Sequence, residues 1–311
     1  MRILLTGANG QLGHALRHSL QPLGEVTCAT REGRLAEDGS RCEAVDLDHP
    51  AALARALQRT APDVVVNAAA YTAVDRAESE PGLAFRINAE AVEALATACA
   101  ARGALLVHYS TDYVFPGDDP RPRHEDDPTG PLNVYGASKL AGEEAIRASG
   151  CRHLLFRTSW VYAAHGRNFL RTMLRLANEE EDLRVVDDQT GAPTPATWVA
   201  RATAEAIEKR GDRSGTWHMA AAGETTWHGF AESIFAEALR TGLIKTAPRV
   251  IPVPASDYPT LAARPASSRL DAGKLQRDFG ITLPDWRQGL VEVIASMADA
   301  LDGRGTDAPG A

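Results

Sequence analysis

The chain has 311 residues, enough for one large α/β domain with a smaller companion, and its 44% hydrophobic and 24% charged residues are ordinary for a globular protein. The formal net charge of −8 argues against broad binding to nucleic acid or to an acidic membrane surface, while a local basic pocket remains compatible with it. No apolar run approaches the ~18 residues of a membrane span and no signal peptide is seen, so we expect a cytoplasmic protein without membrane contact.

The beginning of the chain predicts a dinucleotide site. Residues 2–6 form a short apolar run typical of a buried strand, a glycine-rich turn follows at 7–13, and an amphipathic pattern predicts a helix over about 11–20. Glycines let a backbone approach a pyrophosphate closely, and a helix N-terminus offers unpaired N–H groups to the anion. We therefore assign five residues to the phosphates: Gly7, Gly10, Gln11, Leu12 and Gly13. Glycines that only permit a tight turn are the alternative.

The second predicted strand, residues 25–30, indicates which nicotinamide cofactor is used. Its end lacks the carboxylate that would bind the adenosine ribose in an NAD-preferring site, and Thr30 and Arg31 stand there instead. A guanidinium suits a 2′-phosphate, so we predict NADPH, with NADH use still open. The alternative is that Arg31 is a solvated loop charge.

Strands and helices alternate through the next part of the chain, with strands expected at 44–47 and 62–67 and a helix between them. Such alternation implies right-handed crossovers and a doubly wound parallel sheet. The stretch 67–75 follows the later strand at the edge of the sheet where ligands bind, and its small alanines would let a flat cofactor lie against the backbone. A long alanine-rich helix is expected at about 82–102.

A buried strand is predicted at 105–112, and a helix at about 133–149 carries Tyr135 and Lys139. Four residues apart on a helix, these side chains share one face, so the ammonium can lie beside the phenol and lower its pKa. A phenol that exchanges a proton near neutral pH is what reduction of a carbonyl requires. A chance pair on a solvated helix face is the alternative. The Gly-, Pro- and Asp-rich stretch 116–131 between them predicts a surface loop, which we expect to be a flap over the substrate.

The sequence predicts neither a disulfide nor a metal site. The cysteines are widely spaced and form no C-x-x-C pair: Cys28, Cys42, Cys99 and Cys151. Reduced thiols buried as small hydrophobic groups are therefore expected. His14 and His18 have helical i, i+4 spacing, but no third ligand accompanies them in the sequence.

Three motifs together resemble one protein family. They are the G-x-x-G-x-x-G turn at 7–13, Ser-Thr-Asp-Tyr-Val-Phe at 110–115 and Tyr-Gly-x-Ser-Lys at 135–139. They are similar to the dTDP-4-dehydrorhamnose reductases of the extended short-chain dehydrogenase/reductase superfamily, over about residues 1–300. The resemblance implies a Rossmann-type α/β sheet with a smaller C-terminal substrate-binding lobe. It also implies reduction of the C4 ketone of dTDP-4-dehydro-6-deoxy-L-mannose to dTDP-L-rhamnose. Related dehydratases carry a glutamate where this chain has Tyr113, and a tyrosine there favours simple reduction.

The same resemblance implies the roles of individual residues. Thr111 would hydrogen-bond the C4 oxygen of the substrate, Tyr135 would donate the proton, and Lys139 would hold the nicotinamide ribose and lower the pKa of the phenol. Further cofactor contacts are expected at Thr30, Arg31, Asp46, Leu47, Ala69, Ala70, Tyr71 and Thr72, besides Tyr135 and Lys139. Substrate contacts are expected at Val74, Thr111, Asp112, Trp160 and Arg264.

The expected domain organisation has three parts. Residues 1–159 plus about 194–212 would form the dinucleotide-binding domain, and about 160–193 with 213–300 would form the substrate-binding lobe. Residues 303–311 are small and polar and are expected to be a disordered tail.

The pattern R-P-x-x-S-x-L-D at 264–271 has two interpretations. It could place Arg264 against the substrate diphosphate, or it could cap the helix after Asp271.

Several alternatives stay open at this point. The chain could be a reductase or epimerase of another nucleotide-linked deoxysugar, or a noncatalytic regulatory subunit with the same fold. The helix at about 82–102 resembles the helix pair through which many such enzymes dimerise, but a core helix fits equally well, so a monomer or a homodimer is expected. Some reductases of this group use Mg²⁺ between subunits, yet the sequence offers no convincing ligand cluster for it.

Overall fold

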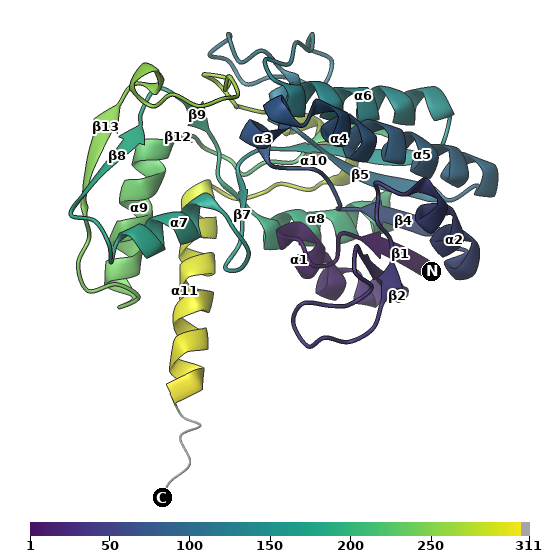
Figure 1. Ribbon diagram of the computed structural model, residues 1–311, viewed down its shortest axis with the longest axis horizontal. Helices are drawn as coiled ribbons and strands as arrows, with labels where there is room; N and C mark the ends of the chain where they lie inside the picture. The colour runs from purple at the N-terminus through teal and green to yellow at the C-terminus, as the bar shows by residue number, and fades with distance from the viewer. Residues whose placement is uncertain (306–311) are drawn as a thin grey trace, which may run out of the picture.

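A seven-stranded parallel sheet forms the centre of the larger part of the molecule (Figure 1). The computed structural model describes residues 1–305. Its strand order is β11-β6-β5-β4-β1-β2-β3, and every neighbouring pair is parallel. The strands are β1 (Arg2–Thr6), β2 (Glu25–Thr30), β3 (Glu43–Ala44), β4 (Val64–Asn67), β5 (Leu105–Thr111), β6 (His153–Thr158) and β11 (Gly215–His218). The predicted doubly wound α/β fold is confirmed, and the order reverses between β1 and β4, where such sheets bind ligands.

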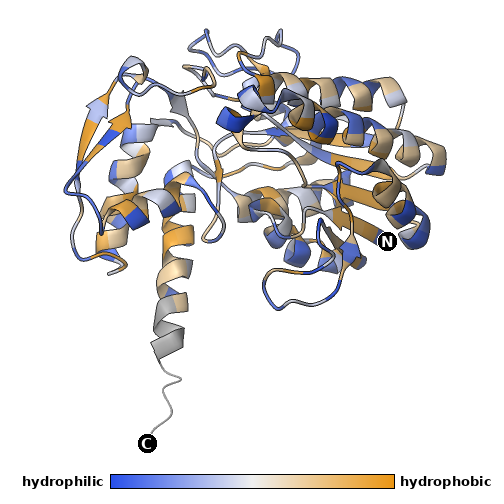
Figure 2. Ribbon diagram, viewed as in Figure 1, coloured by the Kyte–Doolittle hydropathy of each residue, from blue (hydrophilic) through white to orange (hydrophobic). Residues whose placement is uncertain are grey.

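Helices cover both faces of this sheet, as Figure 1 shows. They include α1 (Gln11–Ser19), α2 (Pro50–Thr60), α5 (Ala91–Arg102), α6 (Val134–Ser149) and α8 (Ala196–Lys209). Alternate residues of β1 enter two cores: Ile3 and Leu5 pack with α1 and α8, and Leu4 packs with α2, α5 and α6. Strands buried on both faces are near-continuous hydrophobic runs, and Figure 2 shows them in orange between the helices.

The predicted long helix at about 82–102 is divided into α4 (Pro81–Phe85), a π-helical turn η2 (Arg86–Glu90) and α5. The π turn places the buried Asn88 side chain against the Tyr71 backbone, where it accepts from the Tyr71 N–H at 2.8 Å and donates to its carbonyl at 3.0 Å. Asn88 also donates to Ser138 on α6 at 3.0 Å. Single π turns often mark functional positions, and this one fixes the loop beside the cofactor edge to the helix that carries Tyr135.

A smaller lobe lies to the left in Figure 1. It contains α7 (Phe169–Leu176), β8 (Asp182–Val186), α9 (Trp227–Arg240), β13 (Arg249–Val253) and the start of α11 (Trp286–Gly305). β8 and β13 pair in parallel, and Phe230 of α9 meets Trp286 of α11 edge to face with ring centroids 5.9 Å apart. The short pair of β7 (Val161–Tyr162) with β10 (Thr194–Pro195) joins the lobe to the sheet domain, and a second short pair, β9 (Thr190–Gly191) with β12 (Thr225–Thr226), lies within the lobe.

The remaining elements are short. They are η1 (Gln21–Leu23), α3 (Val74–Ser79), η3 (Asp112–Val114), η4 (Ala255–Asp257) and α10 (Gly273–Phe279). Asp271 accepts a hydrogen bond from the Gly273 N–H at 2.8 Å, so it does cap the first turn of α10. Among residues 1–305, the structure contains no helix of the length and apolarity that crossing a bilayer needs.

Two predicted boundaries differ from the structure. Residues 215–218 were assigned to the substrate lobe, but they form β11 and pair with β6 as an edge strand of the main sheet. The four-residue strand is too short to give a strong sequence pattern, and it follows a Gly- and Arg-rich stretch. The predicted disordered tail at 303–311 is wrong for residues 303–305, which belong to α11; residues 306–311 lie outside the described part.

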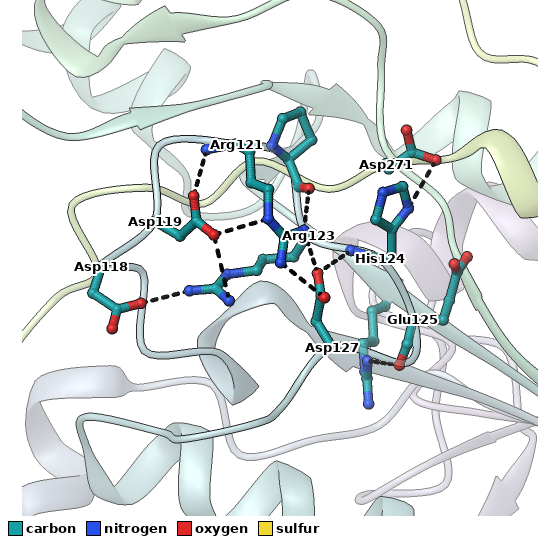
Figure 3. Close-up of polar contacts among 10 residues, drawn as sticks. Asp118, Asp119, Arg121, Arg123, His124, Glu125, Asp127 and Asp271 are labelled. Atoms are coloured by element: carbon teal, nitrogen blue, oxygen red, sulfur yellow. Dashed lines mark hydrogen bonds and ion pairs between the residues drawn. The ribbon is translucent and has the colours of Figure 1, made fainter.

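The expected flap at 116–131 is held in place (Figure 3). Its backbone pairs with the segment 265–271: the Arg123 N–H donates to Arg269 O at 2.9 Å, and the Asp271 N–H donates to Arg123 O at 2.8 Å. Arg121 binds Asp127 with N–O distances of 2.8 and 2.9 Å. These contacts hold the loop against the 265–271 segment.

Candidate active site

A cavity of about 540 Å³ opens at the carboxyl ends of the central strands. Thirteen of the predicted cofactor residues line it: Gly7, Gly10, Gln11, Leu12, Thr30, Arg31, Asp46, Leu47, Ala69, Ala70, Thr72, Tyr135 and Lys139. They come from the ends of β1, β2 and β4, from the connection after β3, and from α1 and α6. The fold therefore brings most of this set to one edge, although their roles toward a cofactor stay predictions.

The cavity is shaped for a pyrophosphate at the start of α1. Gly7 has a φ of +72°, and a Cβ there would lie 2.6 Å from the backbone nitrogen of Ala69. Gly10 is the N-cap of α1 and has no side chain to occupy the first N–H groups of the helix. Those N–H groups and the positive end of the helix dipole suit an anion, so the residues present fit a dinucleotide.

Two predicted cofactor residues lie elsewhere. Within the described residues, Gly13 and Tyr71 are absent from the cavity wall. Gly13 packs α1 against the Gly7 carbonyl, and the Tyr71 hydroxyl donates to Glu80 at 2.6 Å. Three wall residues at the ends of β5 and β6 were not predicted from the sequence: Tyr109, Ser110 and Thr158. The neighbouring positions of β5 and β6 in a parallel sheet could have indicated them.

Tyr135 stands in the first turn of α6, directly beside the end of β5. Asn133 caps this helix, its side-chain oxygen accepting from the Gly136 N–H at 2.7 Å. Gly136 lets α6 approach η3 closely, because a Cβ there would lie 2.3 Å from the Tyr113 carbonyl oxygen. The rings of Tyr113 and Tyr135 meet edge to face with centroids 5.8 Å apart. The cap and the close packing thus fix the phenol at the cavity wall.

The protonation of Tyr135 differs from the prediction. Burial, with Asp112 adding to it, raises the pKa of Tyr135 to about 12, while a hydrogen bond with Thr111 acts in the opposite direction. Lys139 does not lower this pKa here, because its ammonium points to the Tyr109 carbonyl at 2.7 Å and to the His108 ring at 3.1 Å. The phenol is therefore fully protonated at neutral pH and suited to donate a proton.

Asp112 is a buried carboxylate beside the phenol. Its Oδ1 accepts from the Thr111 hydroxyl at 2.9 Å, and its Oδ2 has no hydrogen-bond partner within residues 1–305. Burial raises the pKa of Asp112 to about 6, against the lowering effect of Ser268 and Thr111. A buried acceptor left unpaired costs free energy, and such groups cluster at functional sites.

A second cavity of about 670 Å³ lies in the smaller lobe, between α7, β8, the start of α9 and the segment 255–264. Of the five predicted substrate residues, Arg264 lines it. Arg264 donates to Asp75 of α3 at 2.7 and 3.2 Å, so this ion pair joins the lobe to the sheet domain. The other four line neither cavity as residues 1–305 define them: Val74, Thr111, Asp112 and Trp160.

Trp160 has an indirect relation to the second cavity. Its φ is +47°, and its indole stacks on that of Trp227 with ring centroids 3.6 Å apart and planes 9° from parallel. Trp227 is in the cavity wall. Trp160 therefore supports that wall from behind, and direct contact with a sugar stays a prediction.

The sequence and the fold match a known family. A family model described as the RmlD substrate binding domain covers residues 1–299. The chain belongs to this family. A family relative, the dTDP-4-dehydrorhamnose reductase of Salmonella typhimurium, is 47% identical over 300 residues, which are 96% of this chain and 98% of that protein. The dTDP-4-dehydrorhamnose reductase of Burkholderia thailandensis is 50% identical over 296 residues, covering 92% of this chain and 96% of its own.

A solved structure extends the family match to three dimensions. The crystal structure of dTDP-4-dehydrorhamnose reductase from Bacillus anthracis in complex with NADP superposes with a TM-score of 0.85 at 34% identity. The match covers 95% of this chain and 99% of that one. The resemblance seen in the three motifs is therefore confirmed. Among the described residues, no group of three or more His, Cys, Asp or Glu side chains is placed to hold a metal ion.

Proposed function

We propose that this chain reduces the C4 ketone of dTDP-4-dehydro-6-deoxy-L-mannose with NADPH, giving dTDP-L-rhamnose, the last step of dTDP-rhamnose synthesis. Its relatives are named dTDP-4-dehydrorhamnose reductases, and one of them was crystallised with NADP. The observation that carries the proposal is the half-buried, protonated Tyr135 phenol in the wall of a cavity that fits a dinucleotide. The chain is an NADP-dependent oxidoreductase.

The bound cofactor supplies the hydride, and the residues of the chain supply the proton and the orientation. Tyr135 donates its phenolic proton to the C4 oxygen as negative charge develops there. Its raised pKa keeps the proton in place until the alkoxide forms. Thr111 hydrogen-bonds the same oxygen, and Lys139, in the cavity wall, holds the nicotinamide ribose.

We place the nucleotide part of the substrate in the second cavity. Arg264, held by Asp75, would pair with the diphosphate, because a guanidinium binds phosphate oxygens bidentately. Val74, Asp112 and Trp160 would surround the sugar between this cavity and Tyr135. We further propose that the enzyme acts in the cytoplasm as a monomer or homodimer.

The test is a substrate panel of dTDP-, GDP- and UDP-linked 4-keto sugars with NADPH or NADH, followed as loss of reduced-nicotinamide absorbance. We expect fast turnover with the dTDP-linked 4-dehydro-L-sugar and NADPH, and dTDP-L-rhamnose as the product. Turnover with none of the sugars would leave the regulatory-subunit alternative. Faster turnover with another nucleotide, or product epimerised without net oxidation of NADPH, would identify the other enzyme class.

A further inference from the structure

His108 is a buried titratable residue that the mechanism above does not use. It lies in the middle of β5 with an exposed fraction of 0%. Both ring nitrogens have polar neighbours: Nε2 is 3.1 Å from the Lys139 Nζ, and Nδ1 is 3.1 Å from the amide of Asn67 at the end of β4. A buried imidazole in direct contact with Lys139 can control the direction and the protonation of its amino group.

The contacts of His108 continue to the cofactor edge of the sheet. The Asn67 side-chain oxygen lies 2.6 Å from the Thr6 hydroxyl and accepts from the Ala69 N–H at 3.3 Å. Ala69 lines the cofactor cavity. A continuous row of hydrogen bonds therefore runs from the backbone of the cofactor loop, through Asn67 and His108, to the Lys139 ammonium.

The charged and the uncharged form of Lys139 each require a different arrangement of protons along this row of hydrogen bonds. As an ammonium, Lys139 gives one N–H to the Tyr109 carbonyl at 2.7 Å, and the N–H facing His108 requires a lone pair on Nε2. A neutral imidazole carries one proton and one lone pair, so its proton is then on Nδ1. Asn67 must then turn its amide to present the oxygen, which exchanges the hydrogen bond from the Ala69 N–H for one from Nδ1. As an uncharged amine, Lys139 accepts from Nε2–H, and Nδ1 accepts from the Asn67 amide nitrogen.

The surrounding charges keep the ring neutral and make the lysine titratable. Burial and Lys139 hold the pKa of His108 well below its usual value. Burial lowers the pKa of Lys139 to about 8, opposed by Glu143 one turn further along α6, which is itself paired with Arg157 at 2.7 Å. The other groups facing the row are the Tyr135 phenol on α6, the Thr6 hydroxyl on β1 and the Asn67 amide on β4.

We propose that His108 is a positioning residue that directs the Lys139 ammonium and switches ring tautomer when Lys139 loses its proton. In the switch, Lys139 passes one proton to Nε2 and the ring releases its Nδ1 proton, so that one proton in total leaves to solvent. Asn67 turns its amide to match, so the protonation of Lys139 is coupled to the backbone that holds the cofactor. The importance of this for turnover rests on the proposed function, but the coupling itself does not.

The coupling is tested first in the wild-type protein by nitrogen NMR of ¹⁵N-labelled histidine across the pKa of Lys139. The chain has nine histidines, and the signals lost in His108→Gln assign the one of interest. We expect a neutral ring at every pH, protonated on Nδ1 below pH 8 and on Nε2 above it, with a midpoint at the lysine pKa of about 8. One unchanging tautomer, or an imidazolium, would overturn the proposal.

Three variants test the effect on the reaction. A Gln side chain reaches the position of Nε2 and keeps an acceptor for Lys139, an Asn side chain reaches only the position of Nδ1, and Phe offers neither. We expect kcat/KM within about threefold of wild type for His108→Gln, and roughly tenfold lower for His108→Asn and His108→Phe. In those two, the basic limb of the pH profile should move to lower pH, because the charged lysine loses its acceptor.

The outcomes separate a positioning role from a structural one. A merely structural histidine would lower the melting temperature of all three variants and leave the basic limb where it is, which would overturn the proposal. Failure of the proposed function is a different result, because wild-type protein would then oxidise no NADPH with any 4-keto sugar. The NMR titration needs neither a substrate nor a folded variant other than the one used for assignment, and its result decides the coupling even then.

Discussion

The two cavities described above, the proposed cofactor cavity and the proposed substrate cavity, are built in different ways. The cofactor cavity is lined by the ends of β1, β2, β4, β5 and β6, so its walls follow the order of a parallel sheet. The substrate cavity is lined by pieces of α7, β8 and α9 and by the segment 255–264, which the sheet does not order. The fold determines the walls of the first cavity, whereas the walls of the second depend on which side chains the separate elements carry.

The difference between the cavities reflects the different groups that their proposed ligands need from the chain. A pyrophosphate needs backbone N–H groups and close backbone approach, so glycines must stand at fixed spacing, as in the turn at 7–13. A nucleoside and a sugar need shape and a few polar groups, which many combinations of side chains can supply. We therefore expect changes at the cofactor edge and at Tyr135 to affect the chemistry, and changes in the lobe to affect substrate affinity.

The largest effect is expected at Tyr135, in the wall of the first cavity. Replacing Tyr135 with Phe keeps the ring and its contact with Tyr113 but removes the donated proton, so kcat should fall about 100-fold or more. Steady-state rates with the 4-keto sugar measure this, and NADPH affinity should remain within a few-fold of wild type. Tyr113→Phe is the matched control, and an equal loss of turnover in both variants would contradict the assigned role of Tyr135.

The second effect concerns Asp112 and has a defined pH dependence. Burial raises its pKa in the folded protein to about 6, above the unfolded value, so the folded state loses stability as pH rises through 6. Since one pKa unit is worth about 1.4 kcal/mol, the rise from 3.8 to about 6 should make Asp112→Asn more stable than wild type by roughly 3 kcal/mol at pH 8. The gain should vanish below pH 4, where both states are protonated.

Urea unfolding of both proteins between pH 4 and pH 8 measures this difference. The pH dependence common to the two proteins cancels, which leaves the contribution of Asp112. Turnover of Asp112→Asn should fall, because a residue kept at the site at a cost in stability is expected to serve the substrate. A stability gain that is equal at both ends of the range would contradict the raised pKa.

The same contrast explains how much the sequence predicted. Apart from α3 and the short turns, the strands and helices from 2 to 158 were placed within a few residues, because apolar runs and glycine turns are local signals. The π turn at Arg86–Glu90 was missed, since it depends on what the Asn88 side chain meets across the fold. β11 was missed because its four residues carry too little pattern to predict a strand, and they were therefore assigned to the substrate-binding lobe.

The site was predictable to the same extent. Thirteen cofactor residues reached the expected cavity because their positions follow from the strand ends. The direction of Lys139 was not predictable from its i, i+4 spacing to Tyr135, because the competing acceptors come from β5. Trp160 was identified as an aromatic near the site, but its stacking partner Trp227 lies 67 positions further along the chain, where no local pattern links the two.

A moderate effect on affinity is expected in the substrate cavity. Arg264→Met keeps the bulk of the side chain but removes its charge, so KM for the nucleotide sugar should rise about tenfold while kcat changes little. Arg249→Met is the control, because Arg249 is also paired with a carboxylate, Asp182 at 2.7 Å, but belongs to β13 outside this wall. A rise in KM that is equal in both variants would remove Arg264 from the diphosphate site.

The smallest effect is expected at the outer end of the cofactor cavity, where Arg31 is exposed. Its side chain is 75% exposed and only 4.0 Å from Glu32, so it has freedom to reach a 2′-phosphate, but water screens the interaction. Arg31→Ala should lower kcat/KM for NADPH about three- to tenfold and leave the value for NADH unchanged. Arg34→Ala, in the same turn but outside the cavity wall, should keep the wild-type ratio of the two cofactors.

Added salt should narrow the NADPH preference of wild type toward that of Arg31→Ala, because a screened ion pair loses strength with ionic strength. A preference that salt and Arg31→Ala both leave intact would place the 2′-phosphate on Thr30 and the backbone of the turn.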